Sequence, residues 1–187
     1  VVTAGGTREP IDPVRFLGNK SSGRQGLAIA AAAARAGARV RVIAANIDDS
    51  VMAFLPSSVE VTRVGSAQQM REATLAQVGG ADALVMTAAV ADFRPEATQA
   101  SKMKKDPTTS DAPTLRLVRN PDILSEIGHG PHRPPLVVGF AAETGTDEEI
   151  LAYGADKAAR KGADYIALNR VGTGVGFGDV PNDIRLL

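Results

Sequence analysis

Gly18-Asn-Lys-Ser-Ser-Gly-Arg-Gln-Gly26 is the stretch of sequence that decides the fold. An apolar opening, Val1-Val-Thr-Ala4, precedes it across a loop rich in Gly and Pro, and an alanine-rich run at 27–34 follows it. This order is typical of a strand, a loop and a helix whose N-terminus carries glycines and hydroxyl groups. Unpaired backbone N–H groups and the positive end of the helix dipole favour phosphate at such a place. The stretch therefore predicts an α/β protein that handles phosphate.

Short apolar runs alternate with helical segments along the rest of the chain. Strands are expected at 39–45, 59–64, 83–90, 136–142 and 165–169, with a last strand at 184–187. Helices are expected at 23–36, 67–78, 121–127 and 146–161. Near-continuous apolar runs suit parallel strands that are covered on both faces. The alternation predicts a Rossmann-like, doubly wound, mostly parallel sheet, with ligands at the carboxyl ends of its strands.

Composition limits the class of protein. The 187 residues suit a single domain, 1–187. The 21 Lys and Arg side chains balance 21 Asp and Glu side chains, which argues against a nucleic-acid or membrane-surface partner. Cysteine is absent, which excludes disulfides and thiolate metal sites, and no apolar run is long enough to span a bilayer. No signal peptide is recognisable, and the abrupt apolar start suggests a fragment of a longer chain.

Residues 93–113 interrupt the alternation of strands and helices. The segment carries Pro95, Pro107 and Pro113 and the basic run Lys102-Met-Lys-Lys105. At about 20 residues it is longer than an ordinary connection, and such loops are usually functional or disordered. One interpretation is a solvated charged surface. The other is a long insertion that acts as a flexible basic flap over a triphosphate, because lysine supplies a compact charge on a flexible stem.

Several residues offer candidate ligand contacts, each beside a purely structural explanation. Thr87-Ala-Ala-Val-Ala-Asp92 ends a predicted strand with small residues that let a ring or a ribose approach, and Asp92 accepts hydrogen bonds from hydroxyls, helps to hold a cation, or caps a helix or turn. Phe140-Ala-Ala-Glu-Thr144 ends the next strand in the same way, and Phe140 is either a core residue or a base-stacking one. Asn19 is either a turn residue or an amide that faces a reacting carbonyl or phosphate. The stretch 18–26 lacks the Lys and the hydroxyl that would make it a P-loop.

Lys157 and Lys161 lie four residues apart on one face of the last predicted helix. Such lysines usually solubilise a helix, whereas two beside a nucleotide would contact its phosphates. Tyr153 and Lys157 also form Tyr-x-x-x-Lys, the pattern of short-chain dehydrogenases, although the glycine fingerprint of that family is missing. Two alternatives therefore stay open: an NAD(P)-dependent Rossmann-type oxidoreductase and a non-catalytic nucleotide-binding module.

Taken together, the motifs resemble the phosphopantothenate–cysteine ligases (phosphopantothenoylcysteine synthetases) of bacterial coenzyme A synthesis, which often form the carboxyl-terminal half of a bifunctional protein. The motifs that carry the resemblance are Thr3-Ala-Gly-Gly-Thr-Arg-Glu-Pro-Ile-Asp12, Asn19-Lys-Ser-Ser-Gly23, Ala88-Ala-Val-Ala-Asp92, Lys102-Met-Lys-Lys105, Asn120-Pro-Asp-Ile-Leu124 and Phe140-Ala-Ala-Glu-Thr144. They occur in the order of the family and cover most of the chain.

The resemblance implies a CTP-dependent ligase. The carboxylate of 4′-phosphopantothenate attacks the α-phosphate of CTP, which gives an acyl-cytidylate and pyrophosphate. The amine of L-cysteine then displaces CMP and forms 4′-phosphopantothenoylcysteine. Mg2+ would accompany the triphosphate, bound largely through phosphates and water. The resemblance also implies a cytoplasmic homodimer with active sites near the interface, fused in some natural chains to a flavin-dependent decarboxylase.

The resemblance also implies roles for individual residues. Asn19 is expected to convert the acyl-cytidylate, and Lys102 to support the first step on CTP. The residues expected to bind the nucleotide are Ala88, Asp92, Lys102, Pro121, Asp122, Ile123, Leu124, Phe140, Lys157 and Lys161. Ser21, Ser22 and Gly23 are expected to take the phosphate of the substrate, and the metal ligands stay unassigned.

Overall fold

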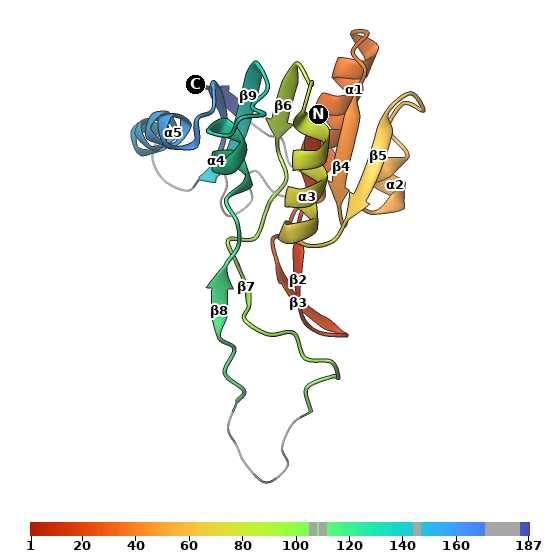
Figure 1. Cartoon of the computed structure of the whole chain (residues 1–187), viewed down its shortest axis with the longest axis vertical. Coiled ribbons are helices and arrows are strands. Elements are labelled where there is room, and N and C mark those ends of the chain that lie inside the picture. Colours follow the sequence, from red (N-terminus) through yellow and green to blue (C-terminus); the bar gives the residue numbers. More distant parts are fainter. Residues whose placement is uncertain (105–107, 109–111, 144–146, 171–183) are drawn as a thin grey trace.

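A seven-stranded sheet forms the centre of the computed structural model, which describes residues 1–104, 108, 112–143, 147–170 and 184–187 (Figure 1). The strands lie in the order β11-β10-β9-β6-β1-β4-β5. Their bounds are β1 Val2–Gly5, β4 Arg41–Ala45, β5 Glu60–Val64, β6 Ala83–Met86, β9 Leu136–Glu143, β10 Tyr165–Arg170 and β11 Ile184–Leu186. Neighbouring strands pair in parallel except β11, which is antiparallel to β10. The predicted Rossmann-like, mostly parallel sheet is confirmed.

Helices cover both faces of this sheet. Their bounds are α1 Arg24–Arg35, α2 Asp49–Met52, α3 Ala67–Val78, α4 Ile123–Gly128 and α5 Asp147–Lys161. Successive side chains of a strand point to opposite faces. Val42 and Ala44 of β4 accordingly pack with α1, whereas Ile43 and Ala45 pack with α3 and α4. The doubly wound arrangement follows from this alternation. None of the helices in the described part is long and apolar enough to cross a membrane.

Local sequence signals explain where the helices begin. Ser66 and Gln69 form a capping box, and α3 has the bounds that the sequence predicts. Asp122 caps α4 by accepting a hydrogen bond from the backbone N–H of Ser125, as its type predicts. Gly23 precedes α1 with a φ of 78°, a conformation that glycine adopts without strain. A Cβ atom on Gly26 would lie 2.6 Å from that of Ala4, so glycine lets α1 approach β1 closely.

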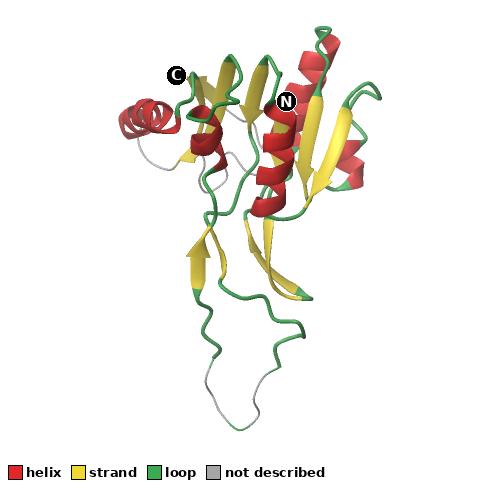
Figure 2. Ribbon diagram, viewed as in Figure 1, coloured by secondary structure: helices red, strands yellow, loops and turns green. Residues whose placement is uncertain are grey.

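Two antiparallel ribbons project beyond the carboxyl ends of the parallel strands (Figure 2). In one, β2 (Arg8–Asp12) pairs with β3 (Arg15–Gly18). In the other, β7 (Phe93–Pro95) pairs with β8 (Leu117–Arg119). We call residues 93–119 the arm, and it contains the predicted flap. The Gly- and Pro-rich segment expected as a loop before α1 instead contains the β2–β3 ribbon, because Asp12 closes its turn by accepting the backbone N–H groups of Val14 and Arg15 at 2.8 Å.

Two further differences concern strand lengths and unplaced segments. The strand predicted at 83–90 ends at Met86. Beyond it, the chain leaves the sheet ladder of β9 but keeps bonding to the end of β1, since Ala89 N–H donates to Gly5 O at 2.8 Å. The short helix α2 was not predicted. Lys105 and the loop expected after Val171 lie outside the described residues.

Candidate active site

A cavity of about 470 Å³ opens at the carboxyl ends of β6 and β9. Its volume falls in the range of small-molecule sites, roughly 300–1,000 Å³. The lining consists of Met86, Ala88, Val90, Ala91, Asp92, Phe93, Arg119, Asn120, Pro121, Asp122, Ile123, Leu124, Phe140, Lys157 and Lys161. The chain builds β4 and β5 on one side of β1 and β6 and β9 on the other. The cavity therefore lies beside the point where the strand order reverses, the usual ligand site of such sheets.

The small-residue wall of the cavity is held by the end of β1. Thr7 is fully buried, and its Oγ1 accepts a hydrogen bond from Ala91 N–H at 2.9 Å. Its own backbone N–H donates to Ala89 O at 3.1 Å. These bonds fix the backbone of 89–91 without any bulky side chain. A flat ring or a sugar can therefore approach the main chain along this wall.

The opposite wall is tied to the first one through Asn120. Its Nδ2 donates to Ala91 O at 2.8 Å, and its backbone N–H donates to Asp92 O at 2.8 Å. Arg94 donates from Nη1 to Arg119 O at 2.6 Å and to Asn120 Oδ1 at 3.1 Å. Asn120 thus links residues 91 and 92, which follow β6, to the segment that leads into α4. The two sides of the cavity are set relative to one another by hydrogen bonds rather than by packing alone.

Charged side chains from two helices meet inside the cavity. The ammonium of Lys161 is ion-paired with Asp122 Oδ2, while Asp122 Oδ1 accepts the backbone N–H of Ser125 at 3.1 Å. Burial raises the pKa of Asp122, but the hydrogen bonds from Lys161 and Ser125 and the charges of Lys161 and Lys157 outweigh it, so the pKa lies below its ordinary value. Two residues predicted separately as nucleotide contacts are therefore bonded to each other.

Asn19 lies at the rim of the cavity rather than in its lining. Its Nδ2 donates to Val90 O at 3.5 Å, so the amide stands next to a lining residue. Its own carbonyl accepts the backbone N–H of Ser21 at 3.0 Å. Ser21 Oγ in turn accepts Gly23 N–H at 3.4 Å, directly before α1. The predicted catalytic amide and the predicted phosphate loop thus form one continuous turn beside the cavity.

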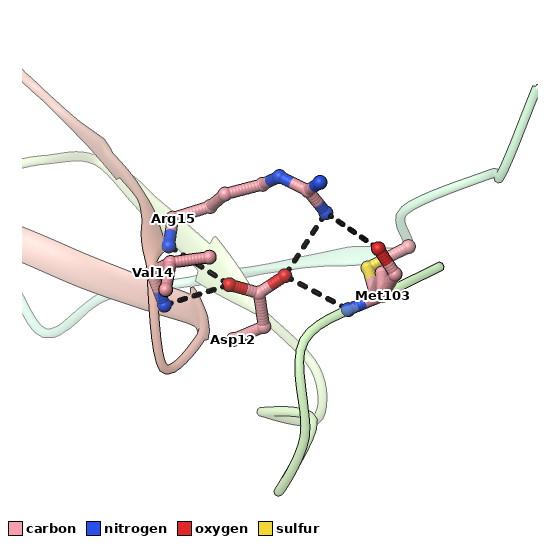
Figure 3. Close-up of polar contacts among 4 residues, drawn as sticks. All are labelled: Asp12, Val14, Arg15 and Met103. Carbon is pink, nitrogen blue, oxygen red and sulfur yellow. Dashed lines mark hydrogen bonds and ion pairs between the residues drawn. The ribbon is translucent and has the colours of Figure 1, made fainter. Parts of the chain in front are cut away.

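Lys102 is exposed on the arm and is not among the described residues that line the cavity. The structure therefore does not bring this residue together with the other predicted nucleotide contacts within one chain. The neighbouring Met103 is bound to Asp12 of the β2–β3 ribbon (Figure 3). The backbone next to Lys102 is therefore held by the β2–β3 ribbon and not by the wall of the cavity.

Sequence reasoning missed part of the lining. The missed residues are Met86, Phe93, Arg119 and Asn120 as a ligand contact, whereas Val90 and Ala91 lie in the small-residue stretch 87–92 that was expected at the ligand edge. Arg119 adds a third basic residue to the cavity, and its signal was its place immediately before the Asn120-Pro121-Asp122 motif. Asn120 was named as the first residue of a motif that carries the resemblance, and not as a ligand contact. The side chain of Tyr153, on which the oxidoreductase alternative depends, lies outside the described part, as does Thr144.

The acidic residues of the cavity fit a metal ion that is carried by phosphates. Within the part of the chain that the structure describes, no group of three His, Asp or Glu side chains could hold a metal ion by itself. Asp92 and Asp122 both line the cavity. One or two carboxylates are the protein share of a typical site for Mg2+ bound to a nucleotide.

Comparison with known proteins identifies the family. The profile of the family described as DNA/pantothenate metabolism flavoprotein C-terminal domain matches residues 1–187. The chain belongs to this family. The chain is 47% identical over 194 residues to the Coenzyme A biosynthesis bifunctional protein CoaBC of Mycobacterium tuberculosis. The match covers 100% of the chain but 45% of that relative, so the domain spans less than half of the relative's length.

Solved structures of similar proteins share the fold of this chain. The crystal structure of the C-terminal domain of a coenzyme A biosynthesis bifunctional protein CoaBC superposes with a TM-score of 0.73 at 33% identity, covering 98% of this chain and 83% of that one. The DNA/pantothenate metabolism flavoprotein from Streptococcus pneumoniae has a TM-score of 0.78 at 19% identity, covering 99% and 90%. The family membership predicted from the motifs is confirmed.

Proposed function

We propose that this domain is the ligase of a coenzyme A biosynthesis protein and joins 4′-phosphopantothenate to L-cysteine with CTP as co-substrate. One observation carries the proposal. Every residue expected to bind the nucleotide, apart from Lys102, lines a single cavity, although these residues come from separate motifs. The relatives named as bifunctional coenzyme A biosynthesis proteins support the pathway. The family match over the whole chain gives no support to an oxidoreductase.

The cavity has the parts that a nucleotide needs. The small residues at 88–91 leave space for the ribose and base beside the backbone, and Phe140 offers an aromatic face. Lys157, Lys161 and Arg119 bring positive charge toward the phosphates. Because Lys161 is paired with Asp122, a bound phosphate has to compete with that carboxylate for the ammonium. We propose that the triphosphate wins this competition because it carries several negative charges.

Two residues outside the lining perform the chemistry in this proposal. Lys102 stabilises the charge that develops on the α-phosphate while the substrate carboxylate attacks and pyrophosphate leaves. Asn19 orients the acyl-cytidylate carbonyl for attack by the cysteine amine, with its amide already beside Val90 at the cavity rim. Mg2+ would be held by the phosphates with Asp92 as the protein carboxylate, and it would neutralise phosphate charge. The walls exclude water from the mixed anhydride.

We further propose a cytoplasmic homodimer whose natural chain carries a flavin-dependent decarboxylase as its other part. Large apolar side chains are exposed on both ribbons: Val14 is 60% exposed, Phe16 52%, Phe93 46% and Leu117 44%. Apolar groups gathered in this way favour an interface between proteins. A dimer formed through the ribbons would offer Lys102 of one chain a route to the cavity of the other.

A pyrophosphate assay with CTP, ATP, GTP and UTP tests the function. We expect pyrophosphate release with CTP that requires 4′-phosphopantothenate but not cysteine, and the coupled product only when cysteine is added. CTP binding without pyrophosphate release would make the domain a non-catalytic nucleotide-binding module. Strong NADPH fluorescence on binding, with no effect of CTP, would favour the oxidoreductase instead.

A further inference from the structure

Asp12 is a buried carboxylate that joins the β2–β3 ribbon to the arm (Figure 3). Its side chain is 0% exposed, and every bond that it makes in the described part is with a donor. Oδ1 accepts the backbone N–H groups of Val14 and Arg15, both at 2.8 Å. Oδ2 accepts Arg15 Nη1 at 3.0 Å and Met103 N–H at 3.1 Å. One oxygen therefore serves the turn of the ribbon, while the other reaches the arm.

Met103 is held at both of its backbone polar groups. Its N–H donates to Asp12, and its carbonyl accepts Arg15 Nη1 at 3.3 Å. Since Arg15 and Asp12 are also ion-paired, a single ion pair holds both backbone polar groups of Met103. Burial raises the pKa of Asp12, but the N–H groups of Val14, Met103 and Arg15 and the Arg15 charge lower it below its usual value. The carboxylate is thus ionised at neutral pH.

The contact at Met103 ends a series of bonds along β2. Thr98 Oγ1 donates to Pro10 O at 3.2 Å, and Gln99 N–H donates to Ile11 O at 2.9 Å. Lys102 and Lys104 flank Met103, and both are exposed. Fixing the backbone of Met103 therefore fixes the points from which both ammonium groups extend. A long charged side chain on an unattached loop would have to be ordered at each turnover instead.

We propose that Asp12 is a positioning residue for Lys102, acting through the Met103 backbone. The inference rests on the proposed function, in which Lys102 serves the first step. The competing explanation is that Asp12 merely closes the turn between β2 and β3. The two carboxylate oxygens of Asp12 allow these roles to be tested separately, because Oδ1 bonds to the turn and Oδ2 bonds to Met103. In Asp12→Asn, the amide oxygen still accepts from Val14 and Arg15, but the NH2 group then faces two donors and cannot hold Met103.

Amide hydrogen exchange on the folded protein tests the contact without any need for activity. In Asp12→Asn we expect the Met103 N–H to exchange at least about tenfold faster, and those of Val14 and Arg15 to change by less than about twofold. Asp49→Asn is the matched control, because it breaks the exposed ion pair with Arg63 and leaves the arm alone. An unchanged Met103 amide in Asp12→Asn would refute the inference, whether or not the domain is a ligase.

Pre-steady-state pyrophosphate release then tests whether Asp12 acts through Lys102. We expect Asp12→Asn to slow release roughly tenfold at saturating CTP, with the KM for CTP within about twofold of the parent. In a Lys102→Ala background the same change should cost less than about twofold, because residues that act in series are not additive. Fully additive losses would mean that Asp12 only supports the ribbon.

Two precautions keep the test decisive. If Asp12→Asn does not fold, Arg15→Gln offers a second test, because it removes the hydrogen bond to the Met103 carbonyl from a side chain that is 47% exposed. It should reproduce both the faster exchange of the Met103 amide and the slower release of pyrophosphate. If the parent protein releases no pyrophosphate with CTP, the proposed function fails, and the exchange rates alone decide whether Asp12 holds the arm.

Discussion

Replacing Thr7 by valine should destabilise the domain through a single backbone N–H group. Thr7 is 0% exposed, and its Oγ1 accepts Ala91 N–H at 2.9 Å. Valine has nearly the same shape, so the substitution leaves no cavity. The buried N–H of Ala91, however, loses its acceptor. Leaving a buried donor unsatisfied costs about 1–3 kcal/mol.

This free energy converts into a measurable change in melting temperature. For a domain of this size, 1 kcal/mol shifts Tm by about 2–4 °C, so Thr7→Val should lower Tm by about 2–12 °C. Urea unfolding should show a lower midpoint with an unchanged m-value, because the surface exposed on unfolding stays the same. Ala91 also lines the cavity, so CTP should bind more weakly to the variant.

Thr74→Val is the matched control. Thr74 is also fully buried, but its Oγ1 donates to Met70 O, a carbonyl within the body of α3. Removing this hydroxyl strips no backbone N–H of its acceptor, so the loss should stay below about 1 kcal/mol. Equal destabilisation by the two substitutions would refute the argument, because it would trace the effect to threonine burial in general rather than to Ala91.

Three further outcomes follow from the site and its supports. Asn19→Ala should leave CTP-dependent pyrophosphate release within about twofold while product formation falls at least tenfold, and equal loss in both assays would remove Asn19 from the second step. Asp122→Asn should be less stable than the parent at pH 7. The gap should shrink as pH falls below about 4 in urea titrations, because a lowered carboxyl pKa adds stability only above that range. Gly26→Val should cost at least about 1–3 kcal/mol by pressing α1 off β1, whereas Ala28→Val on the exposed face of α1 should cost under about 1 kcal/mol, as thermal unfolding would show.

The sequence predicted those elements whose signals are local. α3 was predicted with its observed bounds, Ala67 and Val78, and the capping box of Ser66 and Gln69 shows that the start of this helix is set by a local signal. The parallel strands were predicted because buried strands read as unbroken apolar runs. The β2–β3 ribbon was missed, because Pro10 and Pro13 suggest a loop, and its pairing depends on a carboxylate that closes the turn from the side.

The site divides in the same way. Residues at strand ends were expected together, because the carboxyl ends of parallel strands share one edge of the sheet, and the cavity brings Asp92 and Phe140 together there. The pairing of Lys161 with Asp122 was not foreseen, since it joins two helices whose relative placement is a property of packing. The position of Lys102 away from the cavity likewise depends on contacts between distant segments.

The ion pair between Asp122 and Lys161 has a consequence for turnover. When a bound anion leaves Lys161, the ammonium can return to Asp122, the N-cap residue of α4. Its positive charge is therefore not left unpaired. In the proposed reaction, the departure of CMP therefore leaves an Asp122–Lys161 ion pair and not an unpaired ammonium. This exchange of ionic partners would favour both binding of the highly charged CTP and release of the less charged CMP.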